Sequence, residues 1–268
     1  MLRGPQEING MVLFSRNYRE SDKLVKIFTE SNGKKMFFVR HANKKNSQIS
    51  SAIQPFTQAN YIGELKDEGL SFLNTAKDIH PFFAIQQDIF LSAYATYILN
   101  LSDAAIEDNV YDPFLFGFLK DSLTLISEGY DAEIITNIFE IQILQRFGIQ
   151  LNFSSCAICG SQEEPFDFSD KYHGVLCQKH WSMDERRFHY SPRALHFIKL
   201  FNAISYEQIK SINLSDETKQ HIRQVIDSIY EEYVGLHLKS KKFIDDMQNW
   251  KEMIPKRENK IDKLDNTN

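Results

Sequence analysis

The feature that most constrains this chain is an array of three cysteines and one histidine. Cys156, Cys159, Cys177 and His180 have the spacing C-x2-C and C-x2-H, with 17 residues between the two halves. Each half is a short knuckle that directs two ligands to one point, and two such halves complete a tetrahedral zinc site. Four protein ligands leave no open position for a catalytic water. The array therefore predicts one structural zinc ion per chain, which holds a folded platform together.

The alternative to a metal site is a group of reduced, buried thiols without a ligand. The array contains all 3 cysteines of the chain, and three cysteines cannot all pair in disulfides. Gly160 follows the second cysteine and Gly174 precedes the third, which suits tight knuckle turns. The repetition of the knuckle favours zinc over free thiols. Thiols kept free to bind metal also indicate a reducing, cytoplasmic location.

The size of the chain allows one large domain or two small domains around the metal module. The 268 residues are 42% hydrophobic and include 21 Phe and 11 Tyr, which is enough to build cores. The longest apolar run, Ile89 to Leu99, is far shorter than the roughly 20 residues that span a bilayer. We therefore expect no association with a membrane.

The net charge of −5 conceals an asymmetry between the two parts of the chain. Residues 1–50 contain ten Lys or Arg and four acidic residues, a net charge of +6, so the remaining 218 residues carry −11. A basic N-terminal module on an acidic body can attract a polyanion while the body limits unspecific binding. On charge alone, the alternative is that these cations lie on solvent-exposed faces of strands and bind no partner.

The first 80 residues have the pattern of a small β-domain. Residues 31–33, Ser-Asn-Gly, separate two of the strands and favour a hairpin. Closing five short strands into a barrel removes exposed edges, so we predict an OB-fold barrel, with an SH3-like barrel as the alternative. The predicted strands are Met11–Arg16, Leu24–Glu30, Lys35–His41, Pro55–Leu65 and Leu70–Ala76.

From residue 81 to residue 250 the hydrophobic spacing becomes helical, so the predicted fold class is α+β. Asp112-Pro113, Asp131, Ser191-Pro192 and Ser215 have the residue types that begin helices. The zinc module is predicted as an insertion at about residues 153–187. Residues 251–268 are polar and charged without periodicity, and we expect a disordered tail.

Catalysis has no support in the sequence. The chain contains no G-x-x-x-x-G-K-S/T, no G-x-G-x-x-G and no G-x-S-x-G motif, and none of its 8 histidines is followed by Glu two positions later. Paired acids such as Glu163-Glu164 lie among polar residues and indicate solvated surfaces. We therefore predict a protein without enzymatic activity.

Nucleic-acid binding is supported by basic residues that alternate with aromatics in the predicted barrel. Single-strand binding needs cations along the phosphates and flat rings on which bases stack. Most of the Phe residues here are expected in the core, and Tyr18 is the ring that we most expect to be exposed. The candidate DNA-binding cations of the barrel are Arg16, Arg19, Lys23, Lys34, Lys35, Arg40, Lys44 and Lys45.

A second basic patch, Lys239, Lys241 and Lys242, follows Gly235 near the end of the helical region. It has two interpretations, which the sequence leaves open. The patch either extends a DNA path across the helical domain or places cations at a helix C-terminus, where the helix dipole favours them.

Taken together, these residues resemble the RecO family of bacterial recombination mediators. The likeness extends from about residue 7 to residue 247, and the order and spacing of its segments are more specific than any one of them. The segments are Gly10 to Leu13, Tyr18-Arg19-Glu20, Leu24-Val25, Thr29 before Asn32-Gly33, Val39-Arg40 with Lys44 and Ser47, Gln54-Pro55-Phe56, the two knuckles, Glu231-Glu232-Tyr233, Gly235-Leu236 and Leu238 to Phe243.

The resemblance implies an N-terminal OB-fold, a helical C-terminal domain and a zinc-binding insertion. It also implies binding of single- and double-stranded DNA, annealing of complementary strands and displacement of single-strand-binding protein. With RecR as partner, such proteins help to load RecA during DNA repair and recombination. The role needs no enzymatic activity and no nucleotide cofactor, and it places the protein at the nucleoid of a bacterial cytoplasm.

The sequence departs from many relatives at two places. His180 stands where many relatives have a fourth cysteine, and Arg40-His41-Ala42-Asn43 stands where they often have Arg-Gly-Ala-Arg. The second change removes one cation from the predicted DNA-facing loop, and Lys44 and Lys45 are positioned to supply it.

A hypothesis of a different class is a zinc-containing protein–protein adaptor without a direct role on DNA. The acidic body suits basic or amphipathic peptides, and grooves between helices can accept an apolar segment. Binding of an oligonucleotide distinguishes the two hypotheses.

Overall fold

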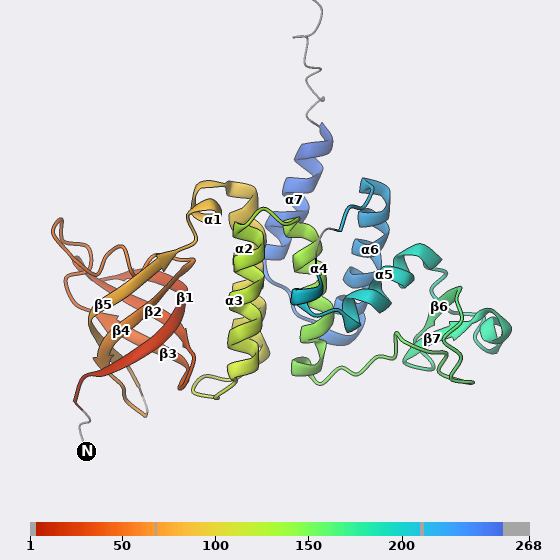
Figure 1. The fold of residues 1–268 in the computed structure, drawn as a ribbon, viewed down its shortest axis with the longest axis horizontal. Coiled ribbons are helices and arrows are strands. Elements are labelled where there is room, and N and C mark those ends of the chain that lie inside the picture. Colours follow the sequence, from red (N-terminus) through yellow and green to blue (C-terminus); the bar gives the residue numbers. More distant parts are fainter. Residues whose placement is uncertain (1–3, 68, 210–211, 254–268) are drawn as a thin grey trace, which may run out of the picture.

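The computed structural model describes residues 4–67, 69–209 and 212–253. Figure 1 shows three parts in a row: a barrel at one end, a helical body in the middle and a small two-stranded module at the other end. Residues 251–253 continue the last helix, and the rest of the predicted tail, from residue 254, lies outside the described residues. Among helices of the described ranges, none has the length and apolar character needed to cross a membrane.

The N-terminal part is a closed five-stranded barrel with the strand order β1-β2-β3-β5-β4. Antiparallel pairing of β1 with β4 closes it, and β3 pairs with β5 in parallel. This topology confirms the predicted OB-fold, and the SH3-like alternative is wrong. The strands are β1 (Gln6–Tyr18), β2 (Asp22–Thr29), β3 (Gly33–Val39), β4 (Thr57–Glu64) and β5 (Ser71–Pro81).

The predicted hairpin between β2 and β3 depends on Gly33. The glycine has a positive φ of 66°, and a Cβ at this position would lie 2.3 Å from the carbonyl oxygen of Val110. The hydroxyl of Thr29 donates to the Gly33 carbonyl at 2.7 Å and accepts from the Asn32 N–H at 2.9 Å. Only glycine fits both the backbone conformation and the close approach of the helical body.

The helical body begins directly after the barrel and follows the start signals in the sequence. Asp112, Asp131 and Ser215 each accept a backbone N–H at the start of a helix, as predicted. Pro113 and Pro192 occupy the first turns of α3 and α5. The helices are α1 (Phe83–Gln87), α2 (Ile89–Ala105), α3 (Pro113–Ser127), α4 (Ala132–Ile143), α5 (Pro192–Ala203), α6 (Asp216–Ile229) and α7 (Lys239–Met253).

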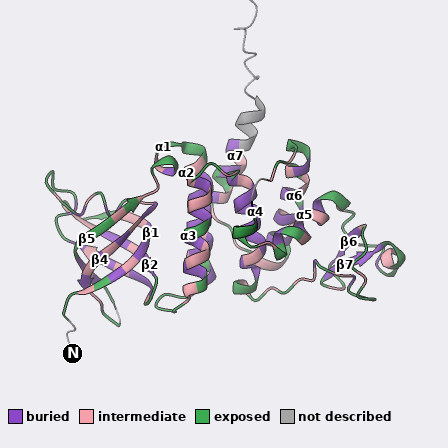
Figure 2. Cartoon of the chain, viewed as in Figure 1, coloured by how far each residue is buried: buried purple, intermediate pink, exposed green. Residues whose placement is uncertain are grey.

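A buried ion pair connects the helices of this body. The Glu140 carboxylate on α4 is fully buried and accepts from both Nη atoms of Arg223 on α6, at 2.5 and 2.9 Å. The hydroxyl of Tyr97 on α2 donates to the same carboxylate at 2.6 Å. Because a buried charge without partners is very costly, this network specifies how the three helices pack. Figure 2 shows buried residues on the sides of the helices that face each other.

The barrel is joined to the helical body through part of its outer face. Met11, Leu13 and Phe28 belong to the hydrophobic core of the helices, and the rings of Phe28 and Phe116 pack edge to face at 5.6 Å. A second, separate core fills the barrel interior and includes Val25 and Phe37. The barrel thus has an interior core of its own and shares part of its outer face with the core of the helical body.

Lysines of the barrel strengthen this contact. The buried ammonium of Lys34 donates to Asp103 Oδ1 at 2.9 Å, to the Ile106 carbonyl at 2.6 Å and to the Asp103 carbonyl. Lys26 pairs with Asp103 at 2.6 Å and with Asp108 at 2.9 Å. Because α2 ends at Ala105, Lys34 satisfies carbonyl groups that the helix leaves without intrahelical partners.

We predict that Lys34→Met lowers the free energy of unfolding by about 2–3 kcal/mol, because two carbonyl oxygens and a carboxylate lose a donor. Urea unfolding followed by circular dichroism measures the change. The control is Lys44→Met, which alters an exposed lysine and should change stability by less than about 0.5 kcal/mol. Equal midpoints for the two variants would contradict this role of Lys34.

Candidate metal centre and nucleic-acid interface

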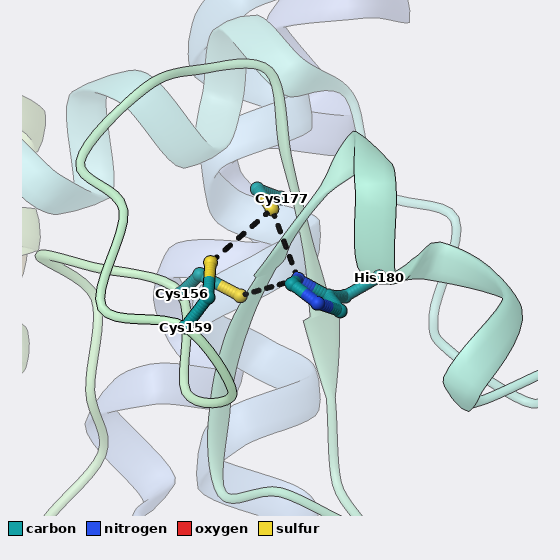
Figure 3. A group of neighbouring side chains, drawn as sticks. All are labelled: Cys156, Cys159, Cys177 and His180. Carbon is teal, nitrogen blue, oxygen red and sulfur yellow. Dashed lines mark hydrogen bonds between the residues drawn. The ribbon is translucent and has the colours of Figure 1, made fainter.

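The four residues of the cysteine and histidine array come together at one point, as predicted. The ligand atoms of Cys156, Cys159, Cys177 and His180 all lie within 4.8 Å of one another. The Nδ1 atom of His180 is 3.5 Å from the Cys156 sulfur and 3.3 Å from the Cys177 sulfur, and the Cys159 and Cys177 sulfurs are 3.8 Å apart (Figure 3). A tetrahedron with Zn–S bonds of about 2.3 Å has S···S edges of about 3.8 Å. The geometry and donor set therefore fit a zinc ion.

The local fold explains how the ligands meet. The first knuckle is closed by hydrogen bonds from Gly160 N–H to the Cys156 carbonyl, at 2.8 Å, and from Cys156 N–H to the Ser161 carbonyl, at 2.7 Å. Gly160 has a positive φ of 73°, as a turn of this kind requires. The second knuckle lies at the end of a two-stranded sheet, β6 (Phe166–Ser169) and β7 (Gly174–Cys177), and continues into a short 3₁₀ helix that carries His180.

Gly174 serves the module in a different way from the predicted knuckle turn. A Cβ at this position would lie 2.8 Å from the Asn152 carbonyl oxygen, so the glycine allows a close approach of two backbone segments. The chain entering the module is fastened there by a parallel bridge between Asn152 and Gly174. This contact sets where the first knuckle stands relative to the second.

The electrostatics of the cluster also suit a cation. Burial raises the pKa of the Cys156 thiol, but hydrogen bonds from neighbouring backbone N–H groups outweigh it and lower that pKa to about 6. Burial and hydrogen bonds with the other two sulfurs raise the pKa of Cys177. One sulfur therefore ionises readily, whereas a second negative charge in the cluster is unfavourable without a positive ion.

The outer face of the barrel carries a strip of aromatic rings, which lies on the same face of β2 and β3 as the helical contact but further along the strands. Tyr18 packs edge to face with Phe38 at 5.9 Å, and Phe38 packs in the same way with Phe72 at 6.0 Å. The guanidinium of Arg19 lies 5.3 Å from the centre of the Tyr18 ring, and the ammonium of Lys66 lies 4.7 Å from that of Phe72. We call Tyr18, Phe38 and Phe72 the aromatic strip.

The strip lies in the region of an OB-fold where nucleic acids bind, between the β1–β2 turn and the β4–β5 loop. Tyr18 is 39% exposed, which confirms that this ring reaches solvent. Phe72 and Lys66 were not predicted as site residues. Phe72 joins the strip only because β3 and β5 pair in parallel with Phe38 opposite Phe72, a pairing between strands that are not consecutive.

Six of the predicted barrel cations lie on β1, on β2, on the turn between these strands and on the loop after β3. Arg16 shares a row of the sheet with Leu24, Phe38 and Phe72. Within the ranges that the structure describes, none of the six forms an ion pair. Arg16, Arg19, Arg40, Lys44 and Lys45 are exposed, and Lys23 is half-buried.

Two predicted cations are placed differently. Lys34 is buried in the contact with the helical body, as described above, and Lys35 is 9% exposed with its ammonium 3.0 Å from the Lys66 carbonyl. Both ammonium groups are bound within the protein, because Lys34 contacts the end of α2 and Lys35 donates to the β4–β5 loop. We therefore leave both out of the proposed DNA interface, in contrast to the prediction from sequence.

The second basic patch begins α7 on the helical body. Lys239 and Lys242 are exposed, whereas Lys241 pairs with Asp227 at 3.0 Å and with Asp245. The lysines stand at the N-terminal end of their helix, so the predicted alternative of cations at a helix C-terminus does not apply to α7. Lys241 has a structural role between α6 and α7.

An OB-fold barrel with cations around aromatic rings, followed by a helical body with a Cys3His module, defines a class of nucleic-acid-associated protein. The family model described as Recombination protein O N terminal matches residues 5–82. The family model described as Recombination protein O C terminal matches residues 86–242. The two matches divide the chain where the barrel ends and the helices begin.

Relatives named DNA repair protein RecO are similar over nearly the whole chain. The protein of Enterococcus faecalis is 57% identical over 248 residues, which cover 92% of this chain and 95% of the relative. That of Streptococcus suis is 52% identical over 254 residues, covering 94% and 97%. That of Lactococcus lactis subsp. cremoris is 50% identical over 248 residues, covering 92% and 98%. The chain belongs to the RecO family of DNA repair proteins.

We predict that purified protein contains about one equivalent of zinc and that Cys156→Ser loses it. Structural zinc contributes on the order of 10 kcal/mol to the folding of such modules, so this variant should also be poorly soluble. His180→Cys keeps four zinc ligands and is the control, with metal content near one equivalent. Metal analysis of the three proteins tests the assignment, and wild-type protein without metal together with a normal yield of Cys156→Ser would overturn it.

Proposed function

We propose that this protein is a recombination mediator that binds DNA on the outer face of its barrel and anneals complementary strands. The observation that carries the proposal is an aromatic strip on a barrel that also presents six cations without ion pairs within the described residues. Rings give bases a surface for stacking, and the cations neutralise phosphates. Membership of the RecO family supports the assignment to DNA repair.

The proposed mechanism involves no bond chemistry. Cations on the face and on loop 40–45 neutralise phosphates of two strands at once, which lowers the repulsion between them and allows pairing. Release of condensed counterions supplies much of the binding free energy, so affinity falls steeply with salt. As the resemblance implies, the protein then displaces single-strand-binding protein and, together with RecR, helps to load RecA. We propose a structural zinc ion for the Cys3His cluster, at the end of the molecule away from the barrel (Figure 1).

A second candidate function, a protein–protein adaptor, is favoured by an apolar groove on the helical body. The groove has a volume of about 370 Å³ and is lined by Phe197, Leu200, Phe201, Ala203 and Ile204 of α5 and the residues after it, with Gln208 and Ile212. A gel shift with an oligonucleotide at low and moderate salt separates the two functions. Wild-type protein that ignores DNA even at low salt would leave only the adaptor.

The loop cations give a prediction about salt dependence. Replacing Arg40, Lys44 and Lys45 together by Ala should weaken binding to single-stranded DNA about 100-fold at 0.1 M salt, because each lost phosphate contact costs roughly fivefold through counterion release. The slope of log K against log salt should fall by about 2, at roughly 0.7 per phosphate. Fluorescence anisotropy with a labelled oligonucleotide measures both.

A matched control removes the same charge from elsewhere. Lys120, Lys171 and Lys179 are exposed on α3 and the metal module, and their joint replacement by Ala should leave the slope unchanged. If the two triple variants bind alike, net charge and not the loop determines affinity, and the loop has no place in the mechanism.

The aromatic strip gives a different prediction. Tyr18→Ala should weaken single-strand binding by about 1–3 kcal/mol, because an exposed ring no longer stacks on a base. Duplex binding and the salt slope should not change, since paired bases are not free to stack on the protein. Tyr18→Phe keeps the ring and should bind like wild type. An equal loss on single and double strands would show that Tyr18 acts only on the phosphates or on the fold.

A further inference from the structure

An acidic residue lies within the basic face of the barrel. Asp22 begins β2, directly after the turn that carries Arg19, and its side chain is 15% exposed. By charge alone, a carboxylate at this position repels the phosphates that the surrounding cations attract. Its contacts indicate why it is there.

The Asp22 carboxylate holds the start of the basic loop 40–45. Its Oδ1 atom accepts the backbone N–H of His41 at 2.8 Å and the hydroxyl of Ser21 at 3.3 Å. The hydrogen bond from His41 keeps the pKa of Asp22 below its usual value, so the carboxylate stays ionised at neutral pH. His41 has a positive φ of 56°, a conformation that a side-chain-bearing residue adopts only where its surroundings maintain it.

Further contacts fasten the same loop to the same turn. The Asn43 N–H donates to the Ser21 carbonyl at 2.9 Å, and the Asn43 amide side chain donates to Asn17 Oδ1 at 3.2 Å. Beyond it, the Lys44 N–H donates to the His41 carbonyl at 3.1 Å. The loop thus depends on contacts with the β1–β2 turn, and Asp22 contributes a carboxylate to them, which also lies 4.0 Å from the His41 Nδ1 atom.

We propose that Asp22 is a positioning residue that fixes loop 40–45 against the β1–β2 turn, so that Arg40, Lys44 and Lys45 reach the same DNA strand as Arg19. The inference rests on the proposed function and adds to it how the loop cations are oriented. For DNA affinity, it predicts the opposite of what charge alone predicts. Removing this acidic group from a basic surface weakens the binding of DNA.

Three variants test the inference by anisotropy with a labelled single strand over a range of NaCl concentrations. Asp22→Ala removes the acceptor and should bind about tenfold more weakly at 0.1 M salt with a slope lower by about 1, which corresponds to one or two lost phosphates. Asp22→Asn keeps an acceptor oxygen for the His41 N–H and should bind within about twofold of wild type. Glu20→Gln removes the same charge from an exposed position on the same turn, and it should bind as well as wild type or more tightly.

Two further measurements exclude a general loss of structure. Asp22→Ala should speed hydrogen exchange at the amides of residues 40–45 and leave exchange in the helical body unchanged. Added to the triple variant of Arg40, Lys44 and Lys45, it should have no further effect on binding, because its only route is through those cations.

The outcomes separate this inference from the proposed function. If wild-type protein binds DNA and Asp22→Ala binds equally well or more tightly, Asp22 does not position the loop. Weakening of Asp22→Asn to the level of Asp22→Ala would rule out the hydrogen bond to His41 as the positioning contact. If wild-type protein itself does not bind, the proposed function fails.

Discussion

The outer face of a five-stranded barrel is small. Its division between a contact with the helices and a solvent-exposed surface determines how the rest of this structure is arranged. One part, with Met11, Leu13 and Phe28, is buried against the helices, and the buried ammonium of Lys34 closes the end of α2 beside it. The other part keeps the aromatic strip and its cations in solvent. Because the contact with the helices fixes the orientation of the barrel, it also fixes which part of the outer face stays exposed. A smaller contact would expose apolar side chains, and a larger one would cover the strip.

The Cys3His module stands at the opposite end of the molecule from the barrel, as Figure 1 shows. Its four ligands leave no open coordination position, so a metal there stabilises the short β6–β7 sheet and the two knuckles. Between the two ends, the Glu140–Arg223 pair with Tyr97 fixes the packing of α2, α4 and α6. The chain thus separates the basic, aromatic surface of the barrel from the Cys3His cluster and from the buried Glu140–Arg223 pair, and these two centres specify the packing of the other parts.

Much of this architecture could be predicted because it depends on local signals. Knuckle spacing brings Cys156 and Cys159 together whatever the rest of the chain does, and Asp112 or Ser215 cap helices through bonds only a few residues away. The barrel topology followed from strand number and turn residues. In contrast, Lys34 and Lys35 were expected to bind DNA, since alternation along a strand does not show that α2 covers Lys34 or that the β4–β5 loop binds the ammonium of Lys35.

The sequence by itself determined the OB-fold barrel, the helical body and the four residues of the Cys3His cluster, because periodicity, caps and cysteine spacing are short-range properties. Only the tertiary structure decided which barrel cations remain available and which rings form one surface. Phe38 and Phe72 are 34 positions apart and meet through the parallel pairing of β3 with β5, while Lys26 and Lys34 meet Asp103 on a helix of the other domain. Contacts of this kind join residues that are far apart in the chain, so the local pattern of the sequence does not predict them.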